Sequence, residues 1–257
     1  MLPTTVVGSY ALPGWLCQAE EAARAGRFGE KDLEELRHDA VLAAVHDQES
    51  AGVDVITDGE MGRLDFNLGF YGAFTGLRPL PSPRLWGAPG HDQRGRYEIE
   101  GPLGAPKSLG VVDEFRYLKS VARQAIKATV PGPFTLAGRL VPNSRYPSRR
   151  DIAEALVGIV RHECLALVDN GAETIQVDEP SFACYPEGVS EYVSLFNPTV
   201  AGVRAKIATH LCFGNYKARA VGRRSYRPLF PKILELKADQ FILEFAGREM
   251  AEADLWR

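Results

Sequence analysis

Residues 148–178, SRRDIAEALVGIVRHECLALVDNGAETIQVD, hold a helix followed by a short apolar strand. Ser148 is a suitable N-cap, and Asp151 three residues later makes an imperfect capping box. The helix is predicted to run to about Asn170, where Asn170-Gly171 is a usual C-terminal ending. Residues 173–178 are then short and apolar, which is typical of a strand covered on both faces. This segment is one helix–strand unit of an α/β fold.

The same alternation recurs along the chain. Residues 30–51 place apolar side chains close to the helical period, which predicts an amphipathic helix. Repeated strand–helix units favour a parallel sheet with right-handed crossovers. Short apolar or β-branched runs predict six strands, at residues 4–9, 54–60, 127–131, 173–178, 206–210 and 240–244.

The predicted fold is α/β, a TIM (β/α)8-type barrel that forms one domain over residues 1–257. Six parallel strands leave a barrel with open edges, so we expect it to be truncated after the sixth strand, with the C-terminal strand–helix units missing. Pro and Gly are frequent at about residues 77–110, which predicts an insertion over one barrel face. A hairpin arm is expected around residues 96–99.

Composition excludes several classes of protein. Apolar residues make up 45% of the 257 residues and charged residues 25%, as in ordinary globular proteins. The net charge of -3 gives no reason to expect nucleic acid or a membrane as a partner. The N-terminus lacks the pattern of a signal peptide, so a cytoplasmic location is expected. The four cysteines are scattered, which favours free thiols or ligands over disulfides.

Polar side chains stand at the ends of most predicted strands. The carboxyl ends of the strands in a (β/α) barrel meet at one mouth, where active sites lie. Polar groups in such a place are costly unless they are paired or bound to a ligand. Recurrence on separate strands therefore indicates a site built by Ser9, Glu60, Asp178, Glu179, His210, Cys212 and Glu244.

His210 and Cys212 form the sharpest pattern. Residues two apart on a strand point to the same face, so an imidazole and a thiol lie side by side. Zinc prefers nitrogen and sulfur ligands of this kind, and Glu244 on the next strand can supply a carboxylate oxygen. The alternative interpretation is a buried cysteine beside a hydrogen-bonded histidine. The recurrence of carboxylates at other strand ends favours the zinc site.

Three further strand ends are candidates for binding a small substrate. Asp178 can receive an ammonium group or a hydroxyl, or it can be an N-cap of the following helix. Glu60 can bind an amino group, or it can be a solvated loop carboxylate. Gly8-Ser9 can let a carboxylate approach the backbone N–H groups, or it can be an ordinary turn.

In this order, the motifs resemble the catalytic barrel of cobalamin-independent methionine synthase, and more closely its short single-barrel relatives. The resemblance covers essentially the whole chain. No single motif is specific to the family, but the motifs taken together in this order are specific. They are Val7-Gly8-Ser9, Asp58-Gly59-Glu60, Pro131-Gly132-Pro133-Phe134-Thr135, Gln176-Val177-Asp178-Glu179-Pro180, His210-Leu211-Cys212 and Leu243-Glu244.

This resemblance implies methyl transfer to the thiol of homocysteine, with Zn2+ as cofactor. It implies that the zinc ligands are His210, Cys212 and Glu244. The amino-acid part of homocysteine would be held by Gly8, Ser9, Glu60 and Asp178. The expected methyl donor is a methyl-folate or a methyl-corrinoid protein.

The chain departs from the family pattern in three respects. No cysteine follows Cys212, although the family has a further cysteine ligand. The chain ends at Arg257, before the expected histidine proton donor, so no catalytic residue is assigned. Arg139 and Cys184 stand where the family has a folate-stacking tryptophan and a glutamate. The alternatives are therefore an alkyltransferase of another thiol such as coenzyme M, an inactive truncated remnant, and a related metal-free decarboxylase barrel.

Overall fold

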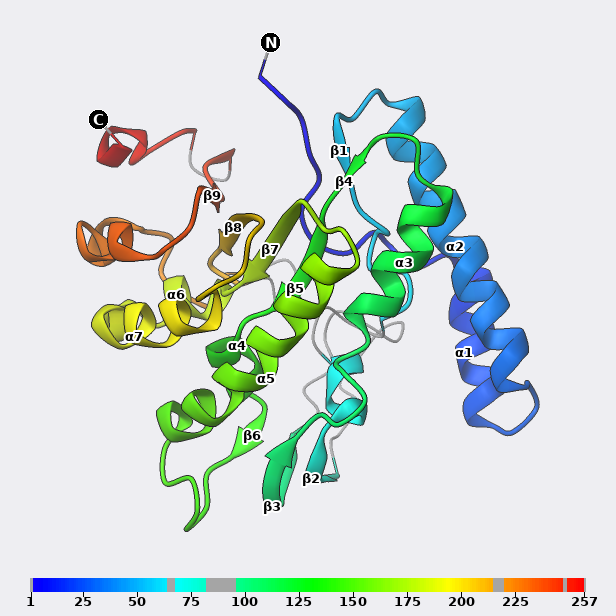
Figure 1. Cartoon of the computed structure of the whole chain (residues 1–257), viewed down its shortest axis with the longest axis horizontal. Coiled ribbons are helices and arrows are strands. Elements are labelled where there is room, and N and C mark those ends of the chain that lie inside the picture. The colour runs from blue at the N-terminus through cyan, green and yellow to red at the C-terminus, as the bar shows by residue number, and fades with distance from the viewer. Residues whose placement is uncertain (1, 64–67, 82–95, 215–219, 247–248, 257) are drawn as a thin grey trace.

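The computed structural model describes residues 2–63, 68–81, 96–214, 220–246 and 249–256. Its central feature is a run of parallel strands that neighbour one another in chain order (Figure 1). The strands are β1 (Val55–Ile56), β4 (Ala125–Ile126), β5 (Ala128–Pro131), β7 (Thr174–Asp178), β8 (Lys206–Leu211) and β9 (Gln240–Leu243). The predicted α/β class with a parallel sheet is confirmed.

Strands β4 and β5 are two parts of one extended run around Lys127. Strand β4 pairs with β1, and β5 pairs with β7, so the run joins the two ends of the sheet. The N–H of Lys127 donates to the carbonyl of Ile56 at 3.1 Å, which continues the pairing between them. All the registers from β5 to β9 are parallel.

The first predicted strand is much shorter than residues 4–9. Within the described part of the chain it pairs only through an isolated parallel bridge between Thr5 and Val55. Gly8 has φ +79°, a conformation that interrupts an extended strand. Val7 is 41% exposed, so this segment lacks the two-sided cover of an inner strand.

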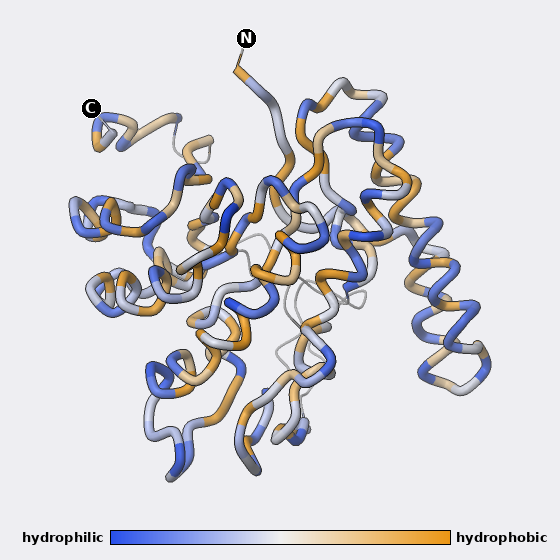
Figure 2. Tube along the Cα trace, viewed as in Figure 1, coloured by the Kyte–Doolittle hydropathy of each residue, from blue (hydrophilic) through white to orange (hydrophobic). Residues whose placement is uncertain are grey.

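Helices form where periodicity and capping predict them. Residues 30–51 fold as α2 (Glu30–Ser50), which packs beside α1 (Gly14–Arg24). Figure 2 shows hydrophilic and hydrophobic residues alternating along both helices. Helix α5 (Arg149–Asp169) begins at Ser148, and its capping box is complete. The Asp151 N–H donates to Ser148 Oγ, and the Ser148 N–H donates to the Asp151 carboxylate.

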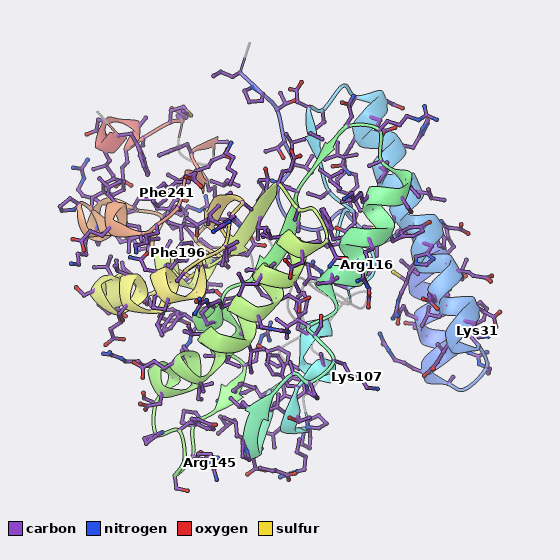
Figure 3. All side chains as sticks on the ribbon, in the orientation of Figure 1. Lys31, Lys107, Arg116, Arg145, Phe196 and Phe241 are labelled. Carbon is purple, nitrogen blue, oxygen red and sulfur yellow. The ribbon has the colours of Figure 1, made fainter. Side chains whose placement is uncertain are left out.

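Other helices cover the sheet and complete the core. They are α3 (Val111–Val121), α4 (Pro133–Ala137), α6 (Pro180–Cys184) and α7 (Val189–Thr199). Phe196 of α7 is fully buried, whereas Lys31 of α2 is exposed at the rim (Figure 3). Short 3-10 turns are η1 (Leu68–Ala73), η2 (Pro186–Gly188), η3 (Arg227–Leu229), η4 (Lys232–Glu235) and η6 (Ala253–Trp256). No helix in the described ranges is long and apolar enough to cross a bilayer.

The predicted insertion contains a small second sheet. Strand β2 (Thr75–Pro79) pairs antiparallel with β3 (Tyr97–Gly104), which is the expected hairpin arm. Strand β3 also pairs parallel with β6 (Leu140–Val141), so the arm is tied to the segment before α5 (Figure 1). Residues 82–95 of the predicted insertion lie outside the described residues.

Candidate metal and substrate site

The predicted site residues lie at the carboxyl ends of adjacent strands. Asp178 ends β7 and is the direct register partner of His210 on β8. Cys212 follows β8, and Glu244 follows β9, whose Leu243 pairs with Leu211. The shared edge of the sheet brings together Asp178 and His210, which are 32 positions apart in the chain.

His210 lies between the predicted substrate-binding residue Asp178 and the predicted metal ligand Cys212. Its Nδ1 lies 3.2 Å from Oδ1 of Asp178, and Cys212 is the other residue that acts on its pKa. Burial lowers the pKa of His210, but the hydrogen bonds with Asp178 and Cys212 outweigh it and raise the pKa to about 10. The metal-free imidazole is therefore protonated at neutral pH. A bound metal would have to replace that proton.

Glu60 is buried beside Ser9. The Ser9 hydroxyl donates to the Glu60 carboxylate, and Arg63 Nη1 lies 3.6 Å from its other oxygen. Burial raises the pKa of Glu60 to about 7 against the opposing effect of Arg63, and the charge of Asp178 adds to the rise. Glu60 is only 2% exposed, so the interpretation as a solvated loop carboxylate is wrong.

The backbone at Glu60 is strained in a way that aims its side chain inward. Gly59 has φ +67° and Glu60 has φ +57°, and the second value is uncommon for a residue with a side chain. The Glu60 N–H donates to Asp58 Oδ1, and the Tyr10 N–H donates to the Gly59 carbonyl. These bonds hold the turn in place. Gly8 lies before Ser9 with open space where a Cβ would be, and its role in carboxylate binding stays a prediction.

Sequence reasoning missed the residues that support Asp178. Lys127 Nζ donates to the carbonyl of Val6 and to Gln176 Oε1, both at 2.7 Å. Because Oε1 accepts from Lys127, the amide of Gln176 presents Nε2 to Asp178 Oδ1, also at 2.7 Å. Asp178 is thus held by Gln176 and His210 rather than acting as an N-cap. The sequence did contain one sign of this support, because Lys127 is a charged residue in the otherwise apolar predicted strand of residues 127–131.

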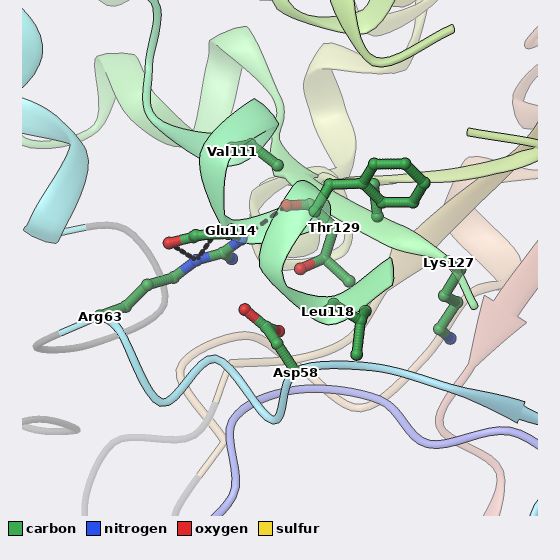
Figure 4. A pocket seen from close by; sticks show the side chains of 9 residues that line it. Asp58, Arg63, Val111, Glu114, Leu118, Lys127 and Thr129 are labelled. Carbon is green, nitrogen blue, oxygen red and sulfur yellow. Dashed lines mark hydrogen bonds and ion pairs between the residues drawn. The ribbon is translucent and has the colours of Figure 1, made fainter. Parts of the chain in front are cut away.

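Arg63, which also faces Glu60, lines a small pocket. Its guanidinium donates to the Glu114 carboxylate and to the carbonyl of Thr129. Thr129 Oγ1 has no hydrogen-bond partner among the described residues. Figure 4 shows this small pocket, lined by Asp58, Arg63, Val111, Glu114, Phe115, Leu118, Lys127, Ala128 and Thr129.

Glu179 holds the N-terminus of α4 against the end of β7. It is fully buried, and its carboxylate accepts hydrogen bonds from the N–H groups of Phe134 and Thr135 at 2.9 Å and from the Thr135 hydroxyl. Gly132 is required here, because a Cβ would lie 2.2 Å from a Glu179 oxygen. Glu179 therefore orders the edge of the site.

The three predicted metal ligands fit zinc chemically, but only two of them lie in contact. An imidazole, a thiol and a carboxylate are ligands that zinc accepts. His210 and Cys212 are two residues apart at the end of β8, and Cys212 is close enough to help raise the pKa of His210. In the part of the chain that the structure describes, no three His, Cys, Asp or Glu side chains converge closely enough to hold a metal. Glu244 thus lies at the end of the adjacent strand, but its side chain does not complete a group of three metal ligands with His210 and Cys212.

Comparison with known proteins decides the family. The family model described as "Cobalamin-independent synthase, Catalytic domain" matches residues 2–256. The chain belongs to this family. Among its curated relatives, a methionine synthase of Sulfolobus acidocaldarius is 36% identical over 263 residues. The match covers 100% of this chain and 72% of that relative. A methionine synthase of Pyrococcus furiosus is 31% identical, with 99% and 71% covered.

One solved structure agrees with this assignment, and a second shows the same fold. A B12-independent methionine synthase from a Shewanella species, in complex with selenomethionine, matches with a TM-score of 0.76 and 26% identity. That match covers 93% of this chain and 72% of the other. A Listeria monocytogenes structure has the same fold, with a TM-score of 0.65, 21% identity, and 94% and 73% covered. Family membership makes the chain an S-methyltransferase with homocysteine as methyl acceptor, and it supports the barrel type of fold.

Proposed function

We propose that this chain is a zinc-dependent methyltransferase that converts homocysteine to methionine, with His210, Cys212 and Glu244 as metal ligands. The observation that carries the proposal is the contact between His210 and Cys212 at the strand edge that also presents Asp178. An imidazole and a thiol in contact suit zinc. When bound, zinc would lower the pKa of a substrate thiol and so supply a thiolate nucleophile at neutral pH.

Glu60 and Asp178 suit the amino-acid end of homocysteine. Both carboxylates are buried, and the charge of Asp178 helps to raise the pKa of Glu60. An ammonium group between them would offset that repulsion. Ser9 and the N–H groups near Gly8 would face the substrate carboxylate. The selenomethionine complex of the Shewanella relative supports an amino-acid pocket, because selenomethionine is the selenium analogue of methionine.

The reaction is a displacement at the methyl carbon. The sulfur of homocysteine forms the new S–C bond, and the bond from the methyl group to the donor breaks with its electron pair leaving on the donor. The protein residues bind and orient the thiol so that attack is in line. We propose a methyl-folate or a methyl-corrinoid protein as donor. Arg139 and Cys184, which replace the family's tryptophan and glutamate, favour a donor other than the usual polyglutamyl folate.

Zinc content and substrate titration test this function. We expect about one zinc per chain after dialysis against the metal, and calorimetric binding of homocysteine that is stronger than that of coenzyme M. Coenzyme M carries a sulfonate in place of an amino acid, so Glu60 and Asp178 would repel it. Stronger binding of coenzyme M would favour the alkyltransferase alternative, and a folded chain without bound zinc would refute the proposal.

Turnover separates an enzyme from an inactive remnant. Methionine formation from homocysteine is measured with methyl-tetrahydrofolate and with methylcobalamin as small-molecule donors. Activity with either one excludes the remnant. The Cys212→Ser variant is expected to lose zinc and activity together, whereas Cys164→Ser, which changes a buried cysteine in α5, is expected to keep both.

A further inference from the structure

One tyrosine hydroxyl connects the two strand ends that carry the proposed zinc ligands. Tyr226 Oη donates to the carbonyl of Leu211 at 2.8 Å, and it accepts the N–H of Glu244 at 2.8 Å. Leu211 lies between His210 and Cys212 in the chain. The side chain of Tyr226 is 1% exposed, so water does not compete for these bonds. A hydroxyl is suited to this place because it donates and accepts at once.

The hydroxyl takes the place of a direct backbone bond. Strands β8 and β9 pair up to Leu211 and Leu243, and the Leu211 carbonyl and Glu244 N–H are the next groups along the edge. A direct ladder bond would join them at roughly 2.9 Å. Two bonds of 2.8 Å in series join them instead, so the strand ends diverge where the ligands begin. The Tyr226 hydroxyl therefore stands between the backbone next to Cys212 and the backbone of Glu244.

The ring of Tyr226 is held from both strands. It packs on Phe213, which follows Cys212, with ring centroids 4.5 Å apart. It also meets Phe245, which follows Glu244, edge to face at 5.8 Å. The Tyr226 N–H donates to the Glu252 carboxylate at 2.7 Å, which ties its backbone in place. Removal of the hydroxyl would thus leave the ring as a spacer and leave both backbone groups unpaired.

We propose that Tyr226 is a positioning residue that sets the distance between Cys212 and Glu244 and thereby the metal affinity of the site. This inference rests on the proposed function, because it takes these residues as zinc ligands. Tyr226 touches backbone groups next to the ligands and has no direct part in the reaction. Residues that orient metal ligands without binding the metal themselves typically change the metal affinity about 10–100-fold when they are removed.

Zinc affinity tests the proposal directly. The Tyr226→Phe variant of the full chain is titrated with zinc against a chromophoric chelator, and we expect affinity at least about 10-fold weaker than in the unmodified chain. The visible spectrum of the cobalt-substituted protein should also change in intensity, because the ligand geometry is altered. Unchanged affinity and an unchanged cobalt spectrum would overturn the proposal.

Tyr192→Phe is a matched control. Tyr192 is equally buried, at 1% exposed, and its hydroxyl donates to a backbone carbonyl, that of Tyr185. It lies on α7 rather than between β8 and β9. This variant loses one buried hydroxyl as well, so it should keep zinc affinity and the cobalt spectrum. An equal loss in both variants would assign the effect to general destabilisation and overturn the positioning role.

Amide exchange tests the bridge without metal. In the metal-free chain, the Glu244 N–H is expected to exchange at least about 10-fold faster in Tyr226→Phe than in Tyr192→Phe, because it has lost its acceptor. Equal exchange in the two variants would refute the bridge. Absence of zinc binding by the unmodified chain, with the exchange difference intact, would instead refute the proposed function and with it the link from Tyr226 to metal affinity.

Discussion

His210 Nδ1 lies 3.2 Å from Asp178 Oδ1, and the two residues are direct partners in the register of β7 and β8. This contact joins a proposed metal ligand, His210, to Asp178, one of the two carboxylates proposed to bind the substrate. Asp178 also accepts a hydrogen bond from Gln176, so one carboxylate oxygen serves both neighbours. The other oxygen is the one that can receive the ammonium group of a substrate.

Asp178→Asn is expected to lower the pKa of His210. The hydrogen bond and charge of Asp178 help to raise this pKa to about 10, and an amide supplies no negative charge. Titration of the imidazole by NMR in the metal-free chain measures the change. Asp113→Asn, at an exposed position of α3, is the control and should leave the His210 pKa unchanged. A His210 pKa still near 10 in Asp178→Asn would contradict the prediction.

Glu60→Gln is expected to weaken homocysteine binding about 10-fold or more, since a buried charge-assisted hydrogen bond to the ammonium is lost. Binding of 4-mercaptobutanoate, which lacks the amino group, should change little. Calorimetry with both ligands measures the difference. Equal losses for the two ligands would show that Glu60 does not recognise the ammonium.

Homocysteine should also bind the unmodified chain more tightly as the pH rises from about 6 to about 8. Burial raises the pKa of Glu60 to about 7, so the carboxylate that pairs with the ammonium gains its charge in this range. The pH dependence should be smaller in Glu60→Gln. Affinity that falls over the same range in the unmodified chain would argue against Glu60 as the ammonium partner.

The metal-free chain is expected to lose stability as the pH rises from about 5 to about 9. Folded Glu60 keeps a proton up to about pH 7, whereas the unfolded group loses it near 4.5, so stability falls over that interval by roughly 3 kcal/mol. His210 acts in the same direction, because its stabilising charge is present below about 6.5 and is lost as the pH rises through about 10. Urea unfolding at several pH values measures the slope, which Glu60→Gln should reduce below pH 7.

Lys127→Met is expected to destabilise the chain by roughly 1–3 kcal/mol, because the buried Gln176 Oε1 and Val6 carbonyl lose their shared donor. Lys119→Met is the control, since Lys119 is exposed and donates to the carbonyl of Asn170. It should change the free energy of unfolding by less than about 0.5 kcal/mol. Similar unfolding midpoints for the two variants would show that the Lys127 bonds add little stability.

Local sequence patterns predicted much of the fold. The capping box at Ser148 formed as predicted, and the helix Glu30–Ser50 and the strands Thr174–Asp178 and Lys206–Leu211 match their predicted ranges to within one residue at each end. These features depend on residues within a few positions of one another, so they can be read without knowledge of the fold. The segment of residues 4–9 did not form a full strand, because its partner and its burial depend on the rest of the sheet.

The sequence by itself also determined which residue types stand at the strand ends, including Glu60, Asp178, His210 and Cys212. Only the tertiary structure decided how they are held. Lys127 reaches Gln176 across 49 positions of the chain. Tyr226 joins the ends of β8 and β9 from a segment with no strand pattern of its own. Such contacts follow from strand register and side-chain packing, which bring distant residues to a few ångströms and leave no periodic trace in the sequence.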